Sequence, residues 1–142
     1  GVILTGEDPP QVENRITLHP TETDQYGLPV AVVTYNYHPN SIAMMDYAED
    51  KAREMYESLG ATDFFTIRNF GATHNLGTAR IGNDPATSVC NSWGQTHDID
   101  NLFISDGSLF PTSGSANPTL TIISLMLRQA DYLIESLENG SI

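Results

Sequence analysis

Apolar and polar residues alternate in the first part of the chain in a way that predicts two strands. In residues 15–19, Ile16 and Leu18 lie on one side and polar residues on the other, which is typical of a strand, and Pro20 is expected to end it. Residues 28–37 are rich in Val, Tyr and Thr, the composition of a second and longer strand. Turn-forming residues separate the two segments. The order strand, turn, strand therefore predicts a hairpin.

The pattern then changes to the spacing of a helix. Pro39 begins it, and either Asn40 or Ser41 can accept a hydrogen bond from an unpaired amide of the first turn. Gly60 is expected to end this helix. A charge pair between Glu49 and Arg53, four residues apart, would support it. The positions that recur at helical spacing are Met45, Ala48, Ala52, Met55 and Leu59, and core packing explains them better than a soft ligand surface.

The middle of the chain mixes short apolar runs with a long irregular region. Residues 64–67 are aromatic and β-branched, which predicts a third strand that joins the hairpin. Residues 71–101 carry glycine and proline breakers without a period, and such a length of loop in a compact domain indicates a function. Residues 102–105 then predict a buried strand with Asp106 and Gly107 at its end.

The last predicted helix is apolar over most of its circumference. Asn117 is a favourable N-cap, Pro118 suits the first helical position, and Gly140 is expected to end the helix. Because apolar residues cover most of its surface, we expect this helix to be buried on several sides. The amides of its first turn, at Thr119 and Leu120, would suit an anion or a carbonyl oxygen.

Composition narrows the classes of function. A chain of 142 residues is long enough for one domain with a core. Its net charge of −12 argues against a nucleic-acid partner, because no Lys/Arg cluster is present to replace phosphate counterions. No apolar run approaches the roughly 20 residues that a membrane span needs. The single Cys90 leaves the compartment open, and the start at Gly1, without a signal sequence, indicates a processed or trimmed chain.

Candidate chemistry is concentrated between residues 73 and 119. His74 is a candidate general base because the ordinary pKa of histidine, about 6.5, lies near working pH, although a loop histidine is more often an ordinary polar residue. His97 is the alternative base and is more simply explained as a hydrogen-bonded turn residue. No cluster has the spacing of metal ligands, and no Gly-x-Ser-x-Gly nucleophile turn is present.

Three ordered motifs give the chain a resemblance to a known family. They are His74-Asn75-Leu76-Gly77-Thr78-Ala79-Arg80-Ile81-Gly82, then Asp100-Asn101-Leu102-Phe103-Ile104-Ser105-Asp106-Gly107-Ser108-Leu109-Phe110-Pro111, then Asn117-Pro118-Thr119-Leu120-Thr121-Ile122. In these motifs the chain resembles the C-terminal portion of the glucose-methanol-choline (GMC) family of FAD-dependent oxidoreductases. The start of the first predicted strand and residues 27–30 resemble the start of the family's substrate-domain sheet more weakly.

The resemblance implies an α+β or α/β fragment of a two-domain fold. Residues 1–13 would form a lead-in, and residues 14–72 a portion of the substrate domain with antiparallel strands and a helix. Residues 73–142 would form a catalytic segment whose strand and long helix complete an FAD-binding domain.

The resemblance also implies roles for single residues. His74 matches the family's catalytic histidine, which takes the proton of a substrate hydroxyl, and Asn117 matches the partner that orients the same oxygen. Asp106 and Gly107 match the strand end that contacts FAD, and the turn of Asn117, Pro118 and Thr119 matches the one beside the flavin pyrimidine ring. The implied reaction passes a hydride from an alcohol or sugar carbon to the flavin.

One element of the family is missing from this sequence. No strand is followed by Gly-x-Gly-x-x-Gly, the turn that seats the dinucleotide pyrophosphate. We therefore expect a fragment or small subunit of a split enzyme, which an N-terminal FAD-binding chain completes. Two alternatives stay open: a GMC-type hydroxynitrile lyase and a non-catalytic structural subunit.

Overall fold

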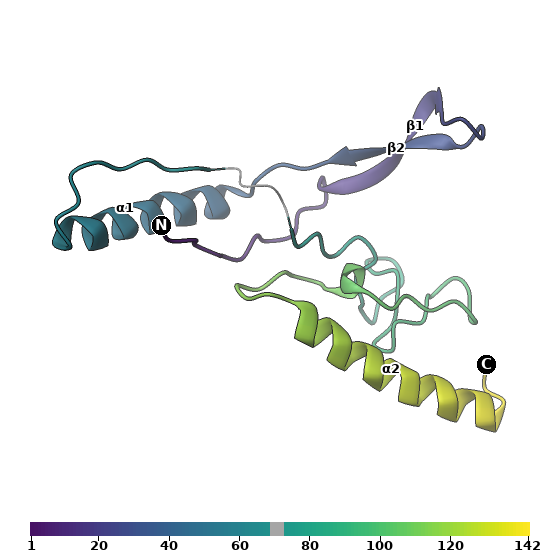
Figure 1. Ribbon diagram of the computed structural model, residues 1–142. Helices are drawn as coiled ribbons and strands as arrows, with labels where there is room; N and C mark the ends of the chain where they lie inside the picture. Colours follow the sequence, from purple (N-terminus) through teal and green to yellow (C-terminus); the bar gives the residue numbers. More distant parts are fainter. Residues whose placement is uncertain (69–72) are drawn as a thin grey trace.

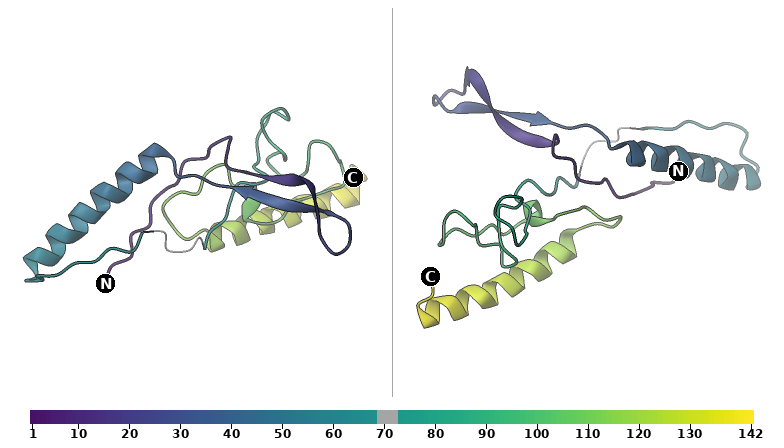
Figure 2. Two further views of the ribbon diagram at one scale, coloured as in Figure 1. Left: turned by 90° about the horizontal axis from the view of Figure 1, so that it is seen from above. Right: turned by 180° about the vertical axis from the view of Figure 1, so that it is seen from behind.

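The computed structural model describes residues 1–68 and 73–142 and contains one hairpin, two long helices and extended loops (Figure 1). The hairpin and the first helix form one part of the molecule, and the second helix lies along the loops of the other part (Figures 1 and 2). This arrangement confirms the predicted fold class, an α+β fragment. The elements are β1 (Arg15–Thr23), β2 (Pro29–Thr34), α1 (Pro39–Ser58), the 3₁₀ turn η1 (Gly107–Leu109) and α2 (Thr119–Asn139).

The hairpin is antiparallel, as predicted, but its first strand is longer than the sequence indicated. Leu18 pairs with Ala31 and Thr23 with Pro29, and the register shifts between these two pairs. β1 therefore passes through Pro20, and the prediction that this proline ends the strand is wrong. A proline has no amide hydrogen for the ladder, and it is accommodated here where the pairing is irregular. β2 ends at Thr34 and is shorter than predicted.

Helix α1 is present with a different cap from the one predicted. The Nδ1 atom of His38 accepts the amide hydrogen of Asn40 at 3.1 Å, so neither predicted capping residue acts as the cap. Pro39 occupies the first turn, where its missing amide hydrogen is not needed. Gly60, with φ +84°, follows the last turn as predicted, and its amide donates to the carbonyl of Glu57 at 2.9 Å.

The segment after α1 runs back along the helix as an extended loop, and the predicted third strand over residues 64–67 is wrong. Its polar groups are bound by a side chain of α1, because Thr66 and Arg68 both donate hydrogen bonds to the carboxylate of Glu49. Arg53, the predicted partner of Glu49, instead lies over the ring of Phe64, 4.9 Å from its centroid. Residues 69–72 lie outside the described residues, including the end of the predicted substrate-domain portion and the start of the predicted irregular region.

Helix α2 begins at Thr119, after Pro118 in a helical conformation, and no side chain caps it. The prediction that Asn117 caps the helix is therefore wrong. Gly140 ends it in the left-handed conformation with φ +72°, as predicted. Neither helix in the described ranges combines the length and the apolar character that crossing a bilayer would require.

The lead-in joins the two parts of the molecule. The hydroxyls of Tyr35 and Ser41 donate to the carboxylate of Asp8, which links it to the end of the hairpin and the start of α1. The amide of Asp8 donates to the Ser113 hydroxyl at 3.2 Å, and Thr112 donates to Glu7. Burial and the neighbouring carboxylate raise the pKa of Tyr35. These bonds connect the N-terminal part to the loop that precedes α2.

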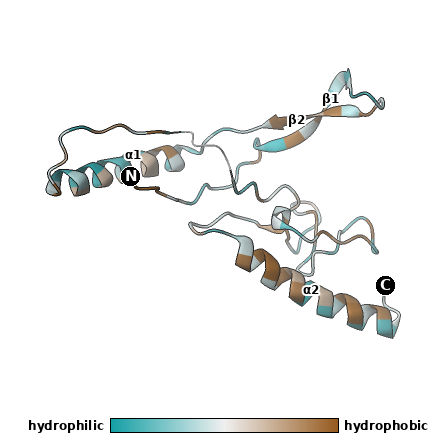
Figure 3. Ribbon diagram, in the orientation of Figure 1, coloured by the Kyte–Doolittle hydropathy of each residue, from teal (hydrophilic) through white to brown (hydrophobic). Residues whose placement is uncertain are grey.

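The chain has little core of its own. Among the described residues, the buried apolar side chains are Cys90 and Leu109, together with Pro118 at the start of α2. Within this chain α2 is not buried on several sides, because an apolar row along the helix is exposed (Figure 3). The exposed members of this row are Leu120, Ile123, Leu127, Ile134 and Leu137.

Candidate active site

The first two motifs lie side by side, joined by backbone hydrogen bonds. The amide of Ala79 donates to the carbonyl of Ser108 at 2.9 Å, and the amide of Ile81 donates to the carbonyl of Leu109 at 2.9 Å. A longer bond of 3.4 Å joins Gly77 to Gly107. The segment that follows His74 is therefore held along the η1 turn.

The third motif meets the first two at Gly107. A Cβ atom on Gly107 would lie 2.6 Å from Cδ2 of Leu76 and 3.1 Å from Cδ1 of Ile122. The first of these distances is shorter than real Cβ contacts, so a larger residue would displace its neighbours. Leu76 belongs to the first motif and Ile122 to helix α2, so the absence of a side chain at Gly107 allows all three motifs to converge.

Asp106 caps the η1 turn. Its Oδ1 atom accepts hydrogen bonds from the hydroxyl of Ser108 at 2.5 Å and from the Ser108 amide at 2.8 Å. The hydroxyl bond and then the amide bond lower the pKa of the Asp106 carboxyl, which is therefore ionised at neutral pH. The predicted buried strand over residues 102–105 is wrong, because it is reduced to one isolated bridge between Phe103 and Gln95.

The two predicted catalytic residues lie at the edges of this assembly. His74 stands three residues before Gly77, so its Cα lies within about 11 Å of that of Gly77. Asn117 directly precedes the buried Pro118 at the start of α2. Both side chains are exposed in this chain, and no hydrogen bond between described residues joins them. Their pairing stays a prediction.

His97, the alternative base, lies in the loop before residue 100. Its Nε2 atom is 2.9 Å from the hydroxyl of Ser88, which also donates to the carbonyl of Asp84 at 2.7 Å. This contact accounts for His97 as a hydrogen-bonded turn residue.

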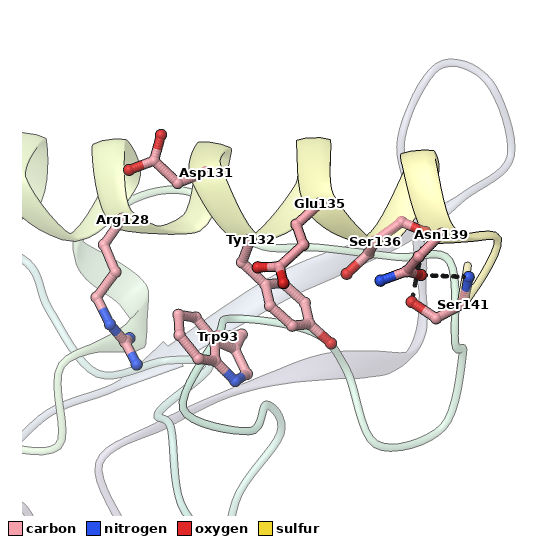
Figure 4. Close-up of a pocket in the computed structure, with 8 residues that line it drawn as sticks. All are labelled: Trp93, Arg128, Asp131, Tyr132, Glu135, Ser136, Asn139 and Ser141. Atoms are coloured by element: carbon pink, nitrogen blue, oxygen red, sulfur yellow. Dashed lines mark hydrogen bonds between the residues drawn. The ribbon is translucent and has the colours of Figure 1, made fainter.

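A group of residues on α2 binds the loop at Trp93. Arg128 donates to the carbonyl of Ser92 at 2.7 Å, and its guanidinium carbon lies 3.7 Å from the centroid of the Trp93 ring (Figure 4). The ring of Tyr132 stacks on Trp93 with a centroid distance of 4.5 Å and an angle of 7°. These side chains line a cavity of about 470 Å³ beside α2. The sequence predictions did not include these residues. Only the spacing of Arg128 and Tyr132, four residues apart on a helix, together with a neighbouring tryptophan could have indicated the group.

The uncapped start of α2 is open to a ligand oxygen. No side chain of residues 1–68 or 73–142 occupies its first-turn amides, and the N-terminus of a helix carries a partial positive charge of about half a unit. Among the residues that the structure describes, no three His, Cys, Asp or Glu side chains gather as a metal site would need. The geometry favours a ligand with an acceptor oxygen or partial negative charge next to this turn.

Burial raises the pKa of the Cys90 thiol, which is fully buried in the same part of the chain. A raised pKa keeps the thiol protonated and unreactive at neutral pH. Cys90 therefore acts as a small apolar core residue.

Comparison with known proteins identifies relatives over nearly the whole chain. A family model described as "GMC oxidoreductase" matches residues 10–125. The 2-methyl-1,2-propanediol dehydrogenase of Mycolicibacterium austroafricanum is 42% identical over 135 residues, which cover 93% of this chain and 24% of that protein.

Two further relatives differ in the compounds that their names give. Paromamine 6'-oxidase of Streptomyces fradiae is 36% identical over 87% of this chain and 23% of that protein. The fructose dehydrogenase large subunit of Gluconobacter japonicus is 32% identical over 92% of this chain and 24% of that protein. The chain thus spans about a quarter of the length of these relatives.

Proposed function

Because the chain belongs to the GMC oxidoreductase family, we propose that it carries the catalytic segment of an FAD-dependent enzyme that oxidises a CH–OH group. The observation that carries the proposal is the convergence of all three motifs at Gly107, between Leu76 and Ile122. The names of the relatives, which give 2-methyl-1,2-propanediol, paromamine and fructose as the compounds oxidised, support an alcohol or sugar as the substrate class.

The residues present fit a flavin. The η1 turn at Asp106 and Gly107 and the turn at Asn117, Pro118 and Thr119 would hold it, next to the uncapped amides of α2. When bound, FAD supplies the hydride acceptor. The helix dipole stabilises negative charge that develops next to the first turn.

His74 would act as the general base. A neutral imidazole can take the proton of a substrate hydroxyl. The amide of Asn117 would donate a hydrogen bond to the same oxygen and fix its orientation. In this role, the backbone bonds along residues 77–81 hold the segment that carries His74 against the η1 turn.

The rest of the flavin site would come from an FAD-binding part with the Gly-x-Gly-x-x-Gly turn. We place this FAD-binding part on the exposed row of leucines and isoleucines of α2. In this row, Leu120 is 78% exposed and Leu137 is 66% exposed. Burying one such side chain contributes about 1.5–3 kcal/mol, so five of them form a substantial interface.

The test uses the assembled enzyme with the His74→Ala substitution. Flavin reduction by substrate, followed under anaerobic conditions by loss of the visible flavin absorption, should slow by about 100- to 10,000-fold. His97→Ala is the matched control and should change the rate by little. A His74→Ala rate within a few-fold of wild type would refute the base, and a wild-type flavin that is never bleached during turnover would favour the lyase alternative.

A further inference from the structure

We propose that Gln129, in the middle of α2, is a positioning residue for the η1 turn that carries Asp106 and Gly107. This inference rests on the proposed function, since the η1 turn is where we place the cofactor. Gln129 is only 3% exposed, although it lies on a helix with a largely exposed apolar row. A buried carboxamide is retained where its donors and acceptor are all used.

The Gln129 carboxamide joins α2 to two separate segments. Its Nε2 donates to the carbonyl of Trp93 at 2.8 Å and to the carbonyl of Ile104 at 2.9 Å. Its Oε1 accepts a hydrogen bond from the hydroxyl of Ser105. Two of these three bonds are to the residues directly before Asp106, so the carboxamide sets their distance from the helix.

Gly94 makes room for this contact. Its φ of +74° is in the left-handed region, and a Cβ atom there would collide with the Gln129 carboxamide and lie 2.7 Å from the carbonyl oxygen of Ile104. The amide of Ile104 donates to the carbonyl of Gly94 at 2.9 Å. Ile104 is therefore fixed from two sides, its amide by the loop and its carbonyl by the helix.

The helix connects this contact to its own first turn. Gln129 lies ten residues after Thr119, which corresponds to about 15 Å along a rigid α-helix. The first turn of α2 and the η1 turn at Asp106 are the two places where we put the flavin. Gln129 would therefore fix the position of one relative to the other without contacting the cofactor.

The experiment compares two substitutions on the same helix in the assembled, FAD-loaded enzyme. Gln129→Met keeps the length of the side chain and removes both donors and the acceptor. Arg128→Met, the matched control, removes the bond to Ser92 and the contact with Trp93 but none to Ile104 or Ser105.

Hydrogen exchange by mass spectrometry gives the first readout. In Gln129→Met, we expect exchange about 5- to 30-fold faster at the amides of Ala79, Ile81 and Ile104, the factor that corresponds to one or two lost bonds. In Arg128→Met, faster exchange should be confined to residues near Ser92. Exchange within twofold of wild type in Gln129→Met, or the same increase in both variants, would overturn the positioning role.

The visible absorption of the bound flavin gives the second readout. Gln129→Met should shift the flavin spectrum and weaken FAD binding, while Arg128→Met should leave both close to wild type. An unchanged spectrum and FAD affinity in Gln129→Met would also overturn the proposal.

Ser105→Ala provides a milder variant should Gln129→Met not fold. It removes one of the three bonds and is expected to give a smaller change in the same amides and in the flavin spectrum. No change at Ile104 would overturn the proposal as well. A wild-type enzyme that binds no flavin would refute the proposed function, and the exchange measurement would still decide whether Gln129 holds the η1 turn.

Discussion

The two parts of the molecule are held together in different ways. In residues 73–142, segments far apart in sequence meet through backbone hydrogen bonds, side-chain-free glycines and the buried carboxamide of Gln129. In residues 15–68, the hairpin and α1 are joined to their neighbours mainly by exposed polar contacts, and apolar side chains such as Leu18 and Val33 face solvent. Residues 73–142 thus define their own shape, whereas the N-terminal part leaves its apolar side chains exposed.

The largest expected difference between the parts is in the response to losing an apolar side chain. Leu109 is 4% exposed, so Leu109→Ala should lower the free energy of unfolding by about 2–5 kcal/mol, because it leaves a cavity. Leu18 is 67% exposed, so Leu18→Ala should change it by about 0.5 kcal/mol or less. Urea denaturation of the 142-residue chain measures both. Equal effects would show that the two parts do not differ in this way.

Two glycines with positive φ provide a closer comparison. Gly94 has φ +74° and Gly27 in the hairpin has φ +81°, so an alanine is strained by a similar amount, about 1–2 kcal/mol, at either position. Around Gly27 no atom lies within 4 Å of a Cβ, whereas at Gly94 it would meet the Ile104 carbonyl oxygen and the Leu109 side chain. Gly94→Ala should therefore destabilise by about 1–3 kcal/mol more than Gly27→Ala. Thermal unfolding of the two variants should show this difference, and matching melting temperatures would argue against close packing at Gly94.

The cap on the η1 turn should have an intermediate, pH-dependent effect. Asp106→Ala removes the acceptor of both Ser108 bonds and should destabilise the chain by about 0.5–2 kcal/mol at pH 7. The pKa of Asp106 is lower in the folded state than its ordinary value of about 3.9. Its carboxylate therefore stabilises the fold above the ordinary pKa, and this stabilisation is lost as the pH falls through the lower, folded-state pKa. The difference between wild type and variant should shrink in acid. Unfolding curves at pH 7 and pH 3 test this, with the exposed Asp98→Ala as control; a difference that is constant with pH would contradict it.

The smallest effect is expected on the exposed side of α1. The guanidinium of Arg68 lies 2.8 Å from the carboxylate of Asp46. Arg68 also donates hydrogen bonds to the carboxylate of Glu49, and these hydrogen bonds are the main cause of the lowered pKa of Glu49. Arg68→Gln should raise the Glu49 pKa toward its ordinary range while changing overall stability little, because exposed ion pairs contribute little. NMR titration of the Glu49 carboxyl group measures this change in pKa. Lys51→Gln, which removes a different cation from the same helix, is the control. A Glu49 pKa that does not change would mean that Arg68 does not bind it in solution.

The sequence predicted helices better than it predicted strands, for a physical reason. Helical periodicity is local, and Gly60 and Gly140 end their helices where expected. The predicted strand over residues 64–67 had suitable composition, but a strand also needs a partner, and the polar groups there bind Glu49 instead. The α1 cap is an imidazole, which is outside the usual set of capping residues.

The candidate site was partly predictable. The motifs around His74, Asp106 and Asn117 could be recognised in the sequence, and the structure brings the segments of the first two together at Gly107. Gln129 could not be predicted, because a glutamine on a helix is normally an exposed residue. Its burial depends on Gly94 and Ile104, which lie far away in sequence and approach it only in the fold.

Leu76, Gly107 and Ile122 meet at one point, but they leave the ribosome in that order and at separate times. At a translation rate of about 5–20 residues per second, seconds pass between the synthesis of the segment that carries His74 and the emergence of η1 and then α2. During this interval, its apolar side chains are accessible to chaperones. The contact at Gly107 therefore forms only when Ile122 has been synthesised, so a pause in translation before α2 would prolong the exposure of the segment that carries Leu76.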